Sequence, residues 1–243
     1  MTSFDSLVAE YDAGRLGYAN DVYNALANFG FSPRYAILDI GCGTGLAGGP
    51  LIENDFNVTG VDPSEPMLAV AKERYPEATW VRGTAESLPF EDSSFDAVIC
   101  AQAFHHFDAG PAMAELRRVL RADGRVGIWW KSLMSDDPVK QLRDAVAVDM
   151  GFAPLNSGWR GGFREFYSAG FSQTGVRVIP WSTIVTLSRF LQYERSRKIV
   201  RDAFGGRDSE YFQRLEERLR ETLGQGDPVM PLTYTHFLYL AKK

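Results

Sequence analysis

Cysteine and long apolar runs are scarce in this chain of 243 residues. Only two cysteines occur, Cys42 and Cys100, and both lie in apolar, strand-like stretches, so we expect neither a disulfide framework nor a metal site. No apolar run approaches the roughly 18 residues of a membrane span. The N-terminus also lacks the basic and then apolar pattern of a signal peptide. We therefore expect a cytoplasmic protein in a reducing setting, without a membrane partner.

An excess of basic charge is also missing. The formal net charge is −5 and the isoelectric point is near 5.3, so there is no basic footprint for a nucleic-acid partner. Hydrophobic residues make up 45% and charged residues 23%, which is typical of a globular protein. The length suits one large α/β domain with an insertion, or two small domains.

The feature that organises the chain is the glycine-rich stretch at residues 36–45. An apolar run predicts a buried parallel strand, and three glycines follow at alternate positions, Gly41, Gly43 and Gly45. Glycines at this spacing expose bare backbone to a ligand, beside the N-terminus of the next helix. Leu46 occupies the last glycine position of the dinucleotide fingerprint, and no P-loop lysine follows, so a dehydrogenase or a P-loop enzyme is disfavoured.

A carboxylate follows the glycines at the end of the next predicted strand. Asp62 lies 17 residues after Gly45. A carboxylate there can accept hydrogen bonds from both hydroxyls of a ribose. No cluster of arginine or lysine lies near the turn, as a pyrophosphate would favour. The pattern therefore indicates a site for a nucleoside without phosphates.

The rest of the chain alternates between strands and helices, which predicts a parallel sheet with right-handed crossovers. The predicted strands are at 35–40, 56–61, 79–81, 95–101, 125–130, 174–181 and 229–240. The predicted helices after residue 131 are at 137–150, 159–169 and, in two or three pieces broken near Gly205, at 182–223. Because the block 182–223 lies between two strands, we expect a helical lid inserted into a single domain of residues 1–243. Residues 1–34 are expected to form a helical segment over the ligand site.

Five segments, taken in order, resemble the motifs of class I S-adenosylmethionine-dependent methyltransferases. They are residues 37–45, 61–67, 82–90, 95–107 and 116–124. The resemblance covers residues 35–130. It implies a Rossmann-like α/β fold with a seven-stranded, mostly parallel sheet, helices on both faces and a helical lid. It also implies S-adenosylmethionine as cofactor, with S-adenosylhomocysteine as product.

The resemblance assigns cofactor contacts residue by residue. The opening residues Tyr11, Asp12, Arg15 and Tyr18 are similar to those of a small-molecule subgroup that includes quinone C-methyltransferases and trans-aconitate methyltransferase. The cofactor-binding residues it implies are Tyr11, Arg15, Asp39, Gly41, Gly43, Gly45, Asp62, Pro63, Met67, Thr84, Ala85, Glu86, Ala101 and Gln102. Many relatives carry an aspartate where this chain has Thr84, so the adenine contact passes to the backbone of Ala85 or to Glu86.

Several of these residues also have plain structural interpretations. Met67 suits the core of a helix, and Tyr11 and Arg15 suit a solvated helix face. His105 and His106 follow the fourth strand and are candidates for a general base or a substrate-orienting group, or else begin a helix that packs on the sheet. A basic run in the expected lid is either a solvated face or a site for an acidic substrate; its residues are Arg195, Arg197, Lys198 and Arg201.

We expect in-line methyl transfer to a small-molecule acceptor. Two alternatives stay open at this point. One is a binding protein that holds the cofactor or a derivative without transferring methyl. The other is a protein or nucleic-acid methyltransferase, which is disfavoured by the acidic isoelectric point and by the absence of an Asn/Asp-Pro-Pro-Tyr motif after the fourth strand. The acceptor, its attacking atom and the oligomeric state do not follow from the sequence.

Overall fold

The computed structural model describes residues 8, 12, 14–155 and 164–243. One seven-stranded sheet has the order β3-β2-β1-β4-β5-β7-β6. β7 pairs antiparallel with both β5 and β6, and the other pairings are parallel. This confirms the expected mostly parallel sheet. The strands are β1 (Ala36–Ile40), β2 (Asn57–Asp62), β3 (Thr79–Arg82), β4 (Phe95–Ala101), β5 (Leu120–Leu133), β6 (Ser172–Thr186) and β7 (Val229–Lys242).

Helices cover both faces of the sheet. The helical elements are α2 (Asn20–Asn28), α3 (Gly49–Ile52), α4 (Glu65–Arg74), the 3-10 helix η2 (Phe104–His106), α5 (Ala109–Val119), α6 (Pro138–Asp149), α7 (Arg164–Ser168), α8 (Leu187–Arg195), α9 (Lys198–Ala203) and α10 (Asp208–Leu223). Alternate residues of β1 enter different cores: Ile37 joins the cluster that holds Leu26 of α2, and Leu38 joins the cluster that holds Leu116 of α5. Such two-sided burial explains the continuous apolar runs of these strands.

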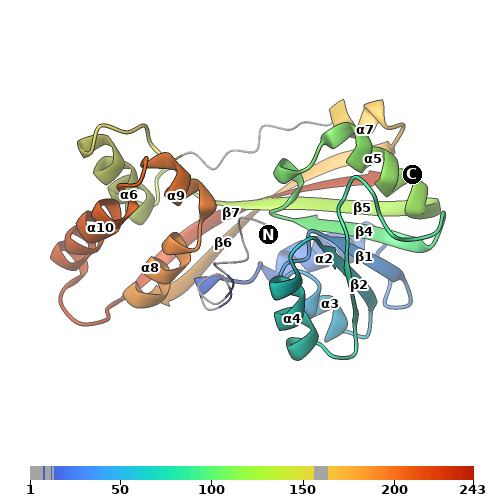
Figure 1. Ribbon diagram of the computed structural model, residues 1–243, viewed down its shortest axis with the longest axis horizontal. Helices are drawn as coiled ribbons and strands as arrows, with labels where there is room; N and C mark the ends of the chain where they lie inside the picture. The colour runs from blue at the N-terminus through green and yellow to red at the C-terminus, as the bar shows by residue number, and fades with distance from the viewer. Residues whose placement is uncertain (1–7, 9–11, 13, 156–163) are drawn as a thin grey trace.

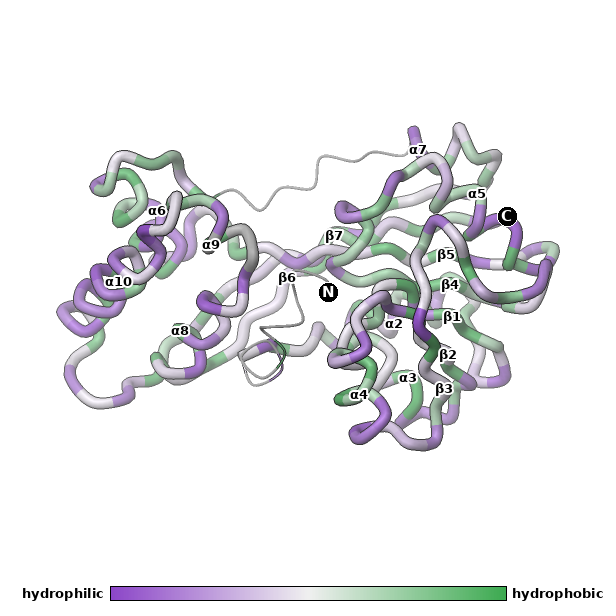
Figure 2. Tube along the Cα trace, viewed as in Figure 1, coloured by the Kyte–Doolittle hydropathy of each residue, from purple (hydrophilic) through white to green (hydrophobic). Residues whose placement is uncertain are grey.

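The last three strands of the sheet extend beyond the others. Figure 1 shows β5, β7 and β6 running from the α/β part to a second part formed by α6, α8, α9 and α10, called the helical part below. A separate apolar cluster unites these helices with the far ends of the long strands, where Phe204 and Tyr211 meet Tyr234. In Figure 2, β1 and β4 are largely hydrophobic, whereas α10 is hydrophilic along much of its length.

The helical block is shorter than the sequence predicts. It begins at Leu187 rather than at residue 182, because β6 continues to Thr186 and pairs with β7 as far as Val229. The expected break lies between α9 and α10, where Gly205 and Gly206 have φ of 54° and 88°. The predicted helix at 45–54 is also shorter, since only Gly49–Ile52 is α-helical. The first part of the predicted helix at 159–169 lies outside the described residues.

A buried ion cluster joins two helices of the helical part. Glu194 of α8 is fully buried and accepts hydrogen bonds from Arg197 at 2.7 Å and from Arg143 of α6 at 3.5 Å. The two guanidinium groups hold the pKa of Glu194 below its ordinary value despite burial, which alone would raise it. Arg197 is therefore a buried structural residue, and the basic run of the sequence is not one solvated face.

Candidate functional site

The glycine turn that follows β1 has a backbone conformation that is unfavourable for residues with a side chain. Gly41, Gly43 and Gly45 have φ of 68°, 54° and 78°. A Cβ on Gly41 would lie 2.6 Å from the Cβ of Ala103, and one on Gly45 would lie 2.8 Å from the ring of Trp80. Both the conformation and the close approach therefore require glycine. The turn is a backbone cradle at the carboxyl ends of β1 and β4, where open α/β sheets bind ligands.

Asp62 is held in a fixed orientation beside this cradle. Its Oδ2 accepts a hydrogen bond from the backbone N–H of Gly43 at 2.9 Å, and its Oδ1 accepts one from Ser64 at 2.9 Å. Ser64 in turn caps α4 through the N–H of Met67. A carboxylate oxygen has more than one lone pair, so a single hydrogen bond does not exhaust its acceptor capacity. The half-buried carboxylate lies beside the glycine turn, and its contact with the ribose hydroxyls stays a prediction.

Asp39 lies inside the sheet rather than at its open edge. Its side chain is fully buried, and neither oxygen makes a hydrogen bond of good geometry to a described residue. Burial raises the pKa of Asp39 to about 7, with a further contribution from Asp62, while the backbone N–H of Gly48 opposes the shift. Contact between Asp39 and the cofactor ammonium stays a prediction.

The raised pKa of Asp39 makes the stability of the ligand-free protein depend on pH. The folded state holds a proton that the unfolded state releases above its ordinary pKa of 3.8, so this contribution is full below pH 4 and is lost as the pH rises to about 7. A shift of about three units corresponds to about 4 kcal/mol. We expect Asp39→Asn to gain stability over the wild type progressively from pH 4 to 8, measured by urea unfolding; a pH-independent difference between the two proteins would contradict this.

The loop after β3 lies next to Asp62. The backbone N–H of Gly83 donates to the carbonyl of Asp62 at 3.2 Å, which ties the start of this loop, residues 83–86, to the end of β2. The Glu86 side chain accepts from the N–H of Asp108 at 2.9 Å, so it ties this loop to the start of α5. Because the Glu86 side chain is engaged in this way, we predict that adenine contacts the backbone of Ala85, one of the two options left by the sequence.

The remaining residues on this side differ in exposure. Met67 is only 3% exposed, whereas Pro63 and Thr84 lie on the surface. At the end of β4, Ala101 is buried, and Gln102 adopts a φ of 57°. The Gln102 side chain donates to the carbonyl of Lys131 at 3.1 Å, so it holds the end of β4 against β5. A cofactor contact at Gln102 would therefore involve its main chain.

The rings of the two histidines of η2 lie against each other, with centroids 4.0 Å apart and ring planes tilted by 42°. The indole N–H of Trp130 donates to Nδ1 of His105 at 3.1 Å. Partial burial, together with smaller contributions from the positive charges of His106 and Arg15, lowers the pKa of His105 to about 4. His105 is thus neutral near pH 7, and since Nδ1 accepts, its proton is on Nε2. In this state Nε2 can donate a hydrogen bond, and Nδ1, the nitrogen that could accept a proton, is already engaged by Trp130.

Arg15 connects the two parts of the molecule at this edge. Tyr11 lies outside the described residues, but Arg15 places its guanidinium 5.3 Å from the ring centroid of Tyr193 in α8. Gly14 packs against the same helix, because a Cβ there would lie 2.6 Å from the backbone nitrogen of Tyr193. The positive charge of Arg15 also contributes to the lowered pKa of His105, which follows β4 in the chain.

Three residues of this site carried no assigned role in the sequence. Trp130 sets the proton position of His105, Tyr193 receives Arg15, and Lys131 holds the N-terminal segment, as described below. The sequence signal that could have pointed to Lys131 was a lysine directly after the apolar strand at 125–130.

Among the described residues, no group of three His, Cys, Asp or Glu side chains is placed to hold a metal. No described helix has the length and hydropathy to cross a membrane.

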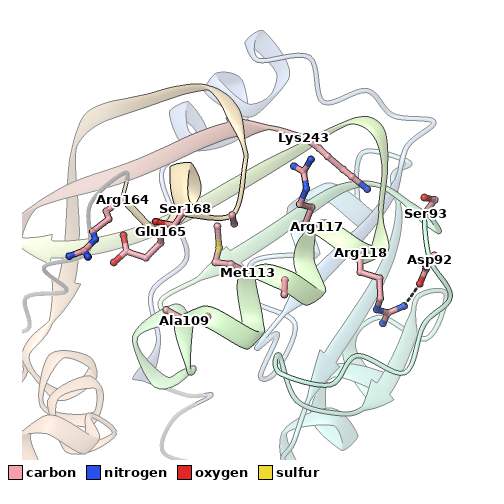
Figure 3. A pocket seen from close by; sticks show the side chains of 13 residues that line it. Asp92, Ser93, Ala109, Met113, Arg117, Arg118, Arg164, Glu165, Ser168 and Lys243 are labelled. Carbon is pink, nitrogen blue, oxygen red and sulfur yellow. Dashed lines mark hydrogen bonds and ion pairs between the residues drawn. The ribbon is translucent and has the colours of Figure 1, made fainter.

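A cavity of about 810 Å³ lies away from this site, between α5 and α7 (Figure 3). Two of its three arginines already have partners: Arg118 binds Asp92 and Glu115, and Arg117 donates to the carbonyl of Gly170 at 2.8 Å. We therefore place the functional site at the glycine turn and not in this groove.

In comparisons with known proteins, the chain is similar to methyltransferases. Residues 38–128 match a family model described as "Methyltransferase domain". An uncharacterized methyltransferase of Mycobacterium tuberculosis is 38% identical over 130 residues, which are 54% of this chain and 52% of the relative. A demethylmenaquinone methyltransferase of Thermotoga maritima is 30% identical over 145 residues, covering 53% and 59% of the two chains. The chain thus spans about half the length of the curated relatives it matches.

Solved structures resemble the chain over nearly its whole length. A candidate type II methyltransferase of Anaeromyxobacter dehalogenans has a TM-score of 0.69 at 25% identity, covering 94% of this chain and 97% of the other. The YcgJ protein of Bacillus subtilis has a TM-score of 0.59 at 22% identity, covering 93% and 99%. The latter shows the same fold.

Proposed function

We propose that this chain, which carries a methyltransferase domain at residues 38–128, transfers a methyl group from S-adenosylmethionine to a small-molecule acceptor. The observation that carries the proposal is the cradle formed by Gly41, Gly43 and Gly45 beside an Asp62 carboxylate that two backbone N–H groups orient. These residues fit a nucleoside with free ribose hydroxyls. A small-molecule acceptor is supported by the relative named for demethylmenaquinone.

The chemistry asks little of the protein beyond placement. Bound S-adenosylmethionine would supply a methyl group on a positively charged sulfur, which is already an activated leaving group. The chain must hold the acceptor atom in line at roughly 3–3.5 Å and exclude water. We assign the ribose to Asp62, the methionine carboxylate to Arg15, and enclosure of the acceptor to the helical part. A cytoplasmic setting stays our prediction, supported by the free and buried Cys42 and Cys100.

The proposal is tested by incubating the protein with methyl-labelled S-adenosylmethionine and an unfractionated cell extract, and then separating small molecules, protein and nucleic acid. We expect the label in a compound of low molecular mass. Label in protein or nucleic acid would contradict the small-molecule acceptor. Tight cofactor binding without transfer to any fraction would favour a binding protein.

We propose that His105 orients the acceptor by donating from Nε2, and does not remove a proton. Glutamine can place an amide N–H near the Nε2 position, so His105→Gln is expected to retain kcat/KM within about 10-fold, while His105→Ala loses about 10- to 100-fold. The pH profile of the wild type should show no ionisation of this residue above pH 5, because the pKa of His105 is about 4. Trp130→Phe serves as a comparator. It removes the hydrogen bond to Nδ1, so that either ring nitrogen of His105 can carry the proton, and it keeps the imidazole.

A general-base role predicts a different pattern. His105→Gln and His105→Ala would then be equally impaired, by about 10²- to 10⁴-fold, because neither side chain accepts a proton. Equal losses in both variants would overturn the donor assignment and leave the methyltransferase proposal intact.

A further inference from the structure

Lys131 is a buried cation in the middle of the sheet. It lies on β5 directly opposite His236 of β7, and its side chain is only 5% exposed. Its ammonium donates to the backbone carbonyls of Leu16 and Gly17, the latter at 2.8 Å. Three rings surround the same nitrogen with centroids at 5.1–5.5 Å, those of Tyr18, Trp181 and Tyr234.

The surroundings of this ammonium hold no opposing charge within ion-pair distance among the described residues. Burial lowers the pKa of Lys131 well below its ordinary value, and the positive charges of Arg15 and Arg189 lower it further. His236 is fully buried opposite Lys131, and neither of its ring nitrogens makes a well-formed hydrogen bond within the described part of the chain. A buried cation without a counter-ion is costly. Its two carbonyl acceptors and the ring faces offset part of that cost.

The two carbonyls that Lys131 binds belong to the segment that presents Arg15. Residues 14–18 are held from one side by Lys131 and from the other by α8, where Gly14 contacts the backbone of Tyr193. Arg15 is the residue between these two attachments. A displacement of Leu16 and Gly17 would therefore move Arg15 away from Tyr193 and from the end of β4.

We propose that Lys131 is a positioning residue that fastens residues 14–18 to the sheet and so sets the place of Arg15 at the cofactor site. The proposal rests on the proposed function, because it takes Arg15 as a ligand of the cofactor. It predicts that removing the ammonium weakens cofactor binding through Arg15, without any direct contact between Lys131 and the cofactor.

Calorimetric titration with S-adenosylhomocysteine tests the role of Lys131. Lys131→Met keeps the length of the side chain and removes the charge, and we expect about 10- to 100-fold weaker binding. Lys131→Arg restores the charge and is expected to recover part of the affinity. Lys243→Met is the matched control, since Lys243 also donates to a backbone carbonyl, that of Leu120, at the other end of β5. The control is expected to bind as the wild type does.

A double-mutant cycle separates positioning from general stability. In an Arg15→Met background, Lys131→Met should cost at most about threefold more, because the group through which it acts is already gone. The same loss in both backgrounds, or wild-type affinity in Lys131→Met, would overturn the proposal. If Lys131→Met does not fold, Lys131→Arg and Lys131→Gln are compared with the wild type instead. An affinity that falls from the wild type to Lys131→Arg to Lys131→Gln supports the role of Lys131. Equal affinities in the three proteins overturn it. Absence of binding by the wild type would instead overturn the proposed function.

Discussion

Replacing Gly41 by alanine is expected to weaken binding of S-adenosylhomocysteine by about 100-fold. The residue has φ of 68°, and the new Cβ would lie 2.6 Å from the Cβ of Ala103. Left-handed strain costs about 1–3 kcal/mol, and the overlap with a backbone-anchored methyl costs about as much again. Relief of the overlap moves the β1 turn away from the end of β4. The end of β1 and the end of β4 then no longer lie correctly relative to each other at the cofactor site. The resulting loss of affinity is measured as the dissociation constant of S-adenosylhomocysteine.

The control for this substitution is Gly175→Ala on β6. Its Cβ would meet only the flexible side chain of Arg177, at 3.9 Å, and its φ is not in the left-handed region. We expect wild-type affinity and a melting temperature within a few degrees of the wild type. Wild-type affinity in Gly41→Ala would contradict the cradle, and equal losses in both variants would assign the effect to stability.

Asp62→Ala is the second large expected effect. The carboxylate accepts from the backbone N–H groups of Gly43 and Ser64, and we assign its remaining acceptor capacity to two ribose hydroxyls. Hydrogen bonds to a charged group contribute about 1.5–3 kcal/mol each. Loss of two such bonds predicts about 10²- to 10⁴-fold weaker binding of S-adenosylhomocysteine. Asp62→Asn keeps one acceptor oxygen, and its affinity for S-adenosylhomocysteine should fall by about 10-fold. The wild type, Asp62→Asn and Asp62→Ala thus form a series of decreasing affinity.

Asp96→Ala is the matched control for this series. Asp96 also accepts from a backbone N–H, that of Ala36 at 2.8 Å, but it does so at the opposite end of β1. The pKa of Asp96 is lowered by its contacts with Arg121 and Ala36, so this variant removes a comparable structural carboxylate. We expect it to lose stability and keep affinity. Equal affinity in Asp62→Ala and the wild type would remove the carboxylate from the site.

The sequence predicts those parts of the site that depend on residues close to one another in the chain. The strand at 95–101 has the predicted bounds, and Asp62 lies beside the glycine turn as its place at a strand end requires. The extension of β6 to Thr186 was missed because pairing with β7 decides it. Residues 182–186 are rich in β-branched side chains, but this preference depends on a partner strand that is distant in sequence.

The electrostatic properties of the site were out of reach for the same reason. The sequence identifies His105 as a candidate base, yet its proton position depends on Trp130, 25 residues away. The role of Lys131 depends on Leu16, at a separation of 115 residues. No spacing of nearby residues in the sequence predicts either contact. A charged or aromatic residue near the end of a predicted central strand does, however, indicate where such a contact should be sought.

Calorimetry on the wild-type protein tests the central claim most directly. S-adenosylmethionine, S-adenosylhomocysteine and NAD⁺ are titrated separately into the same preparation. The glycine cradle with Asp62 predicts saturable binding of S-adenosylmethionine and S-adenosylhomocysteine at one site, and no measurable heat with NAD⁺. Tight binding of NAD⁺, with no binding of either sulfur compound, would contradict the account.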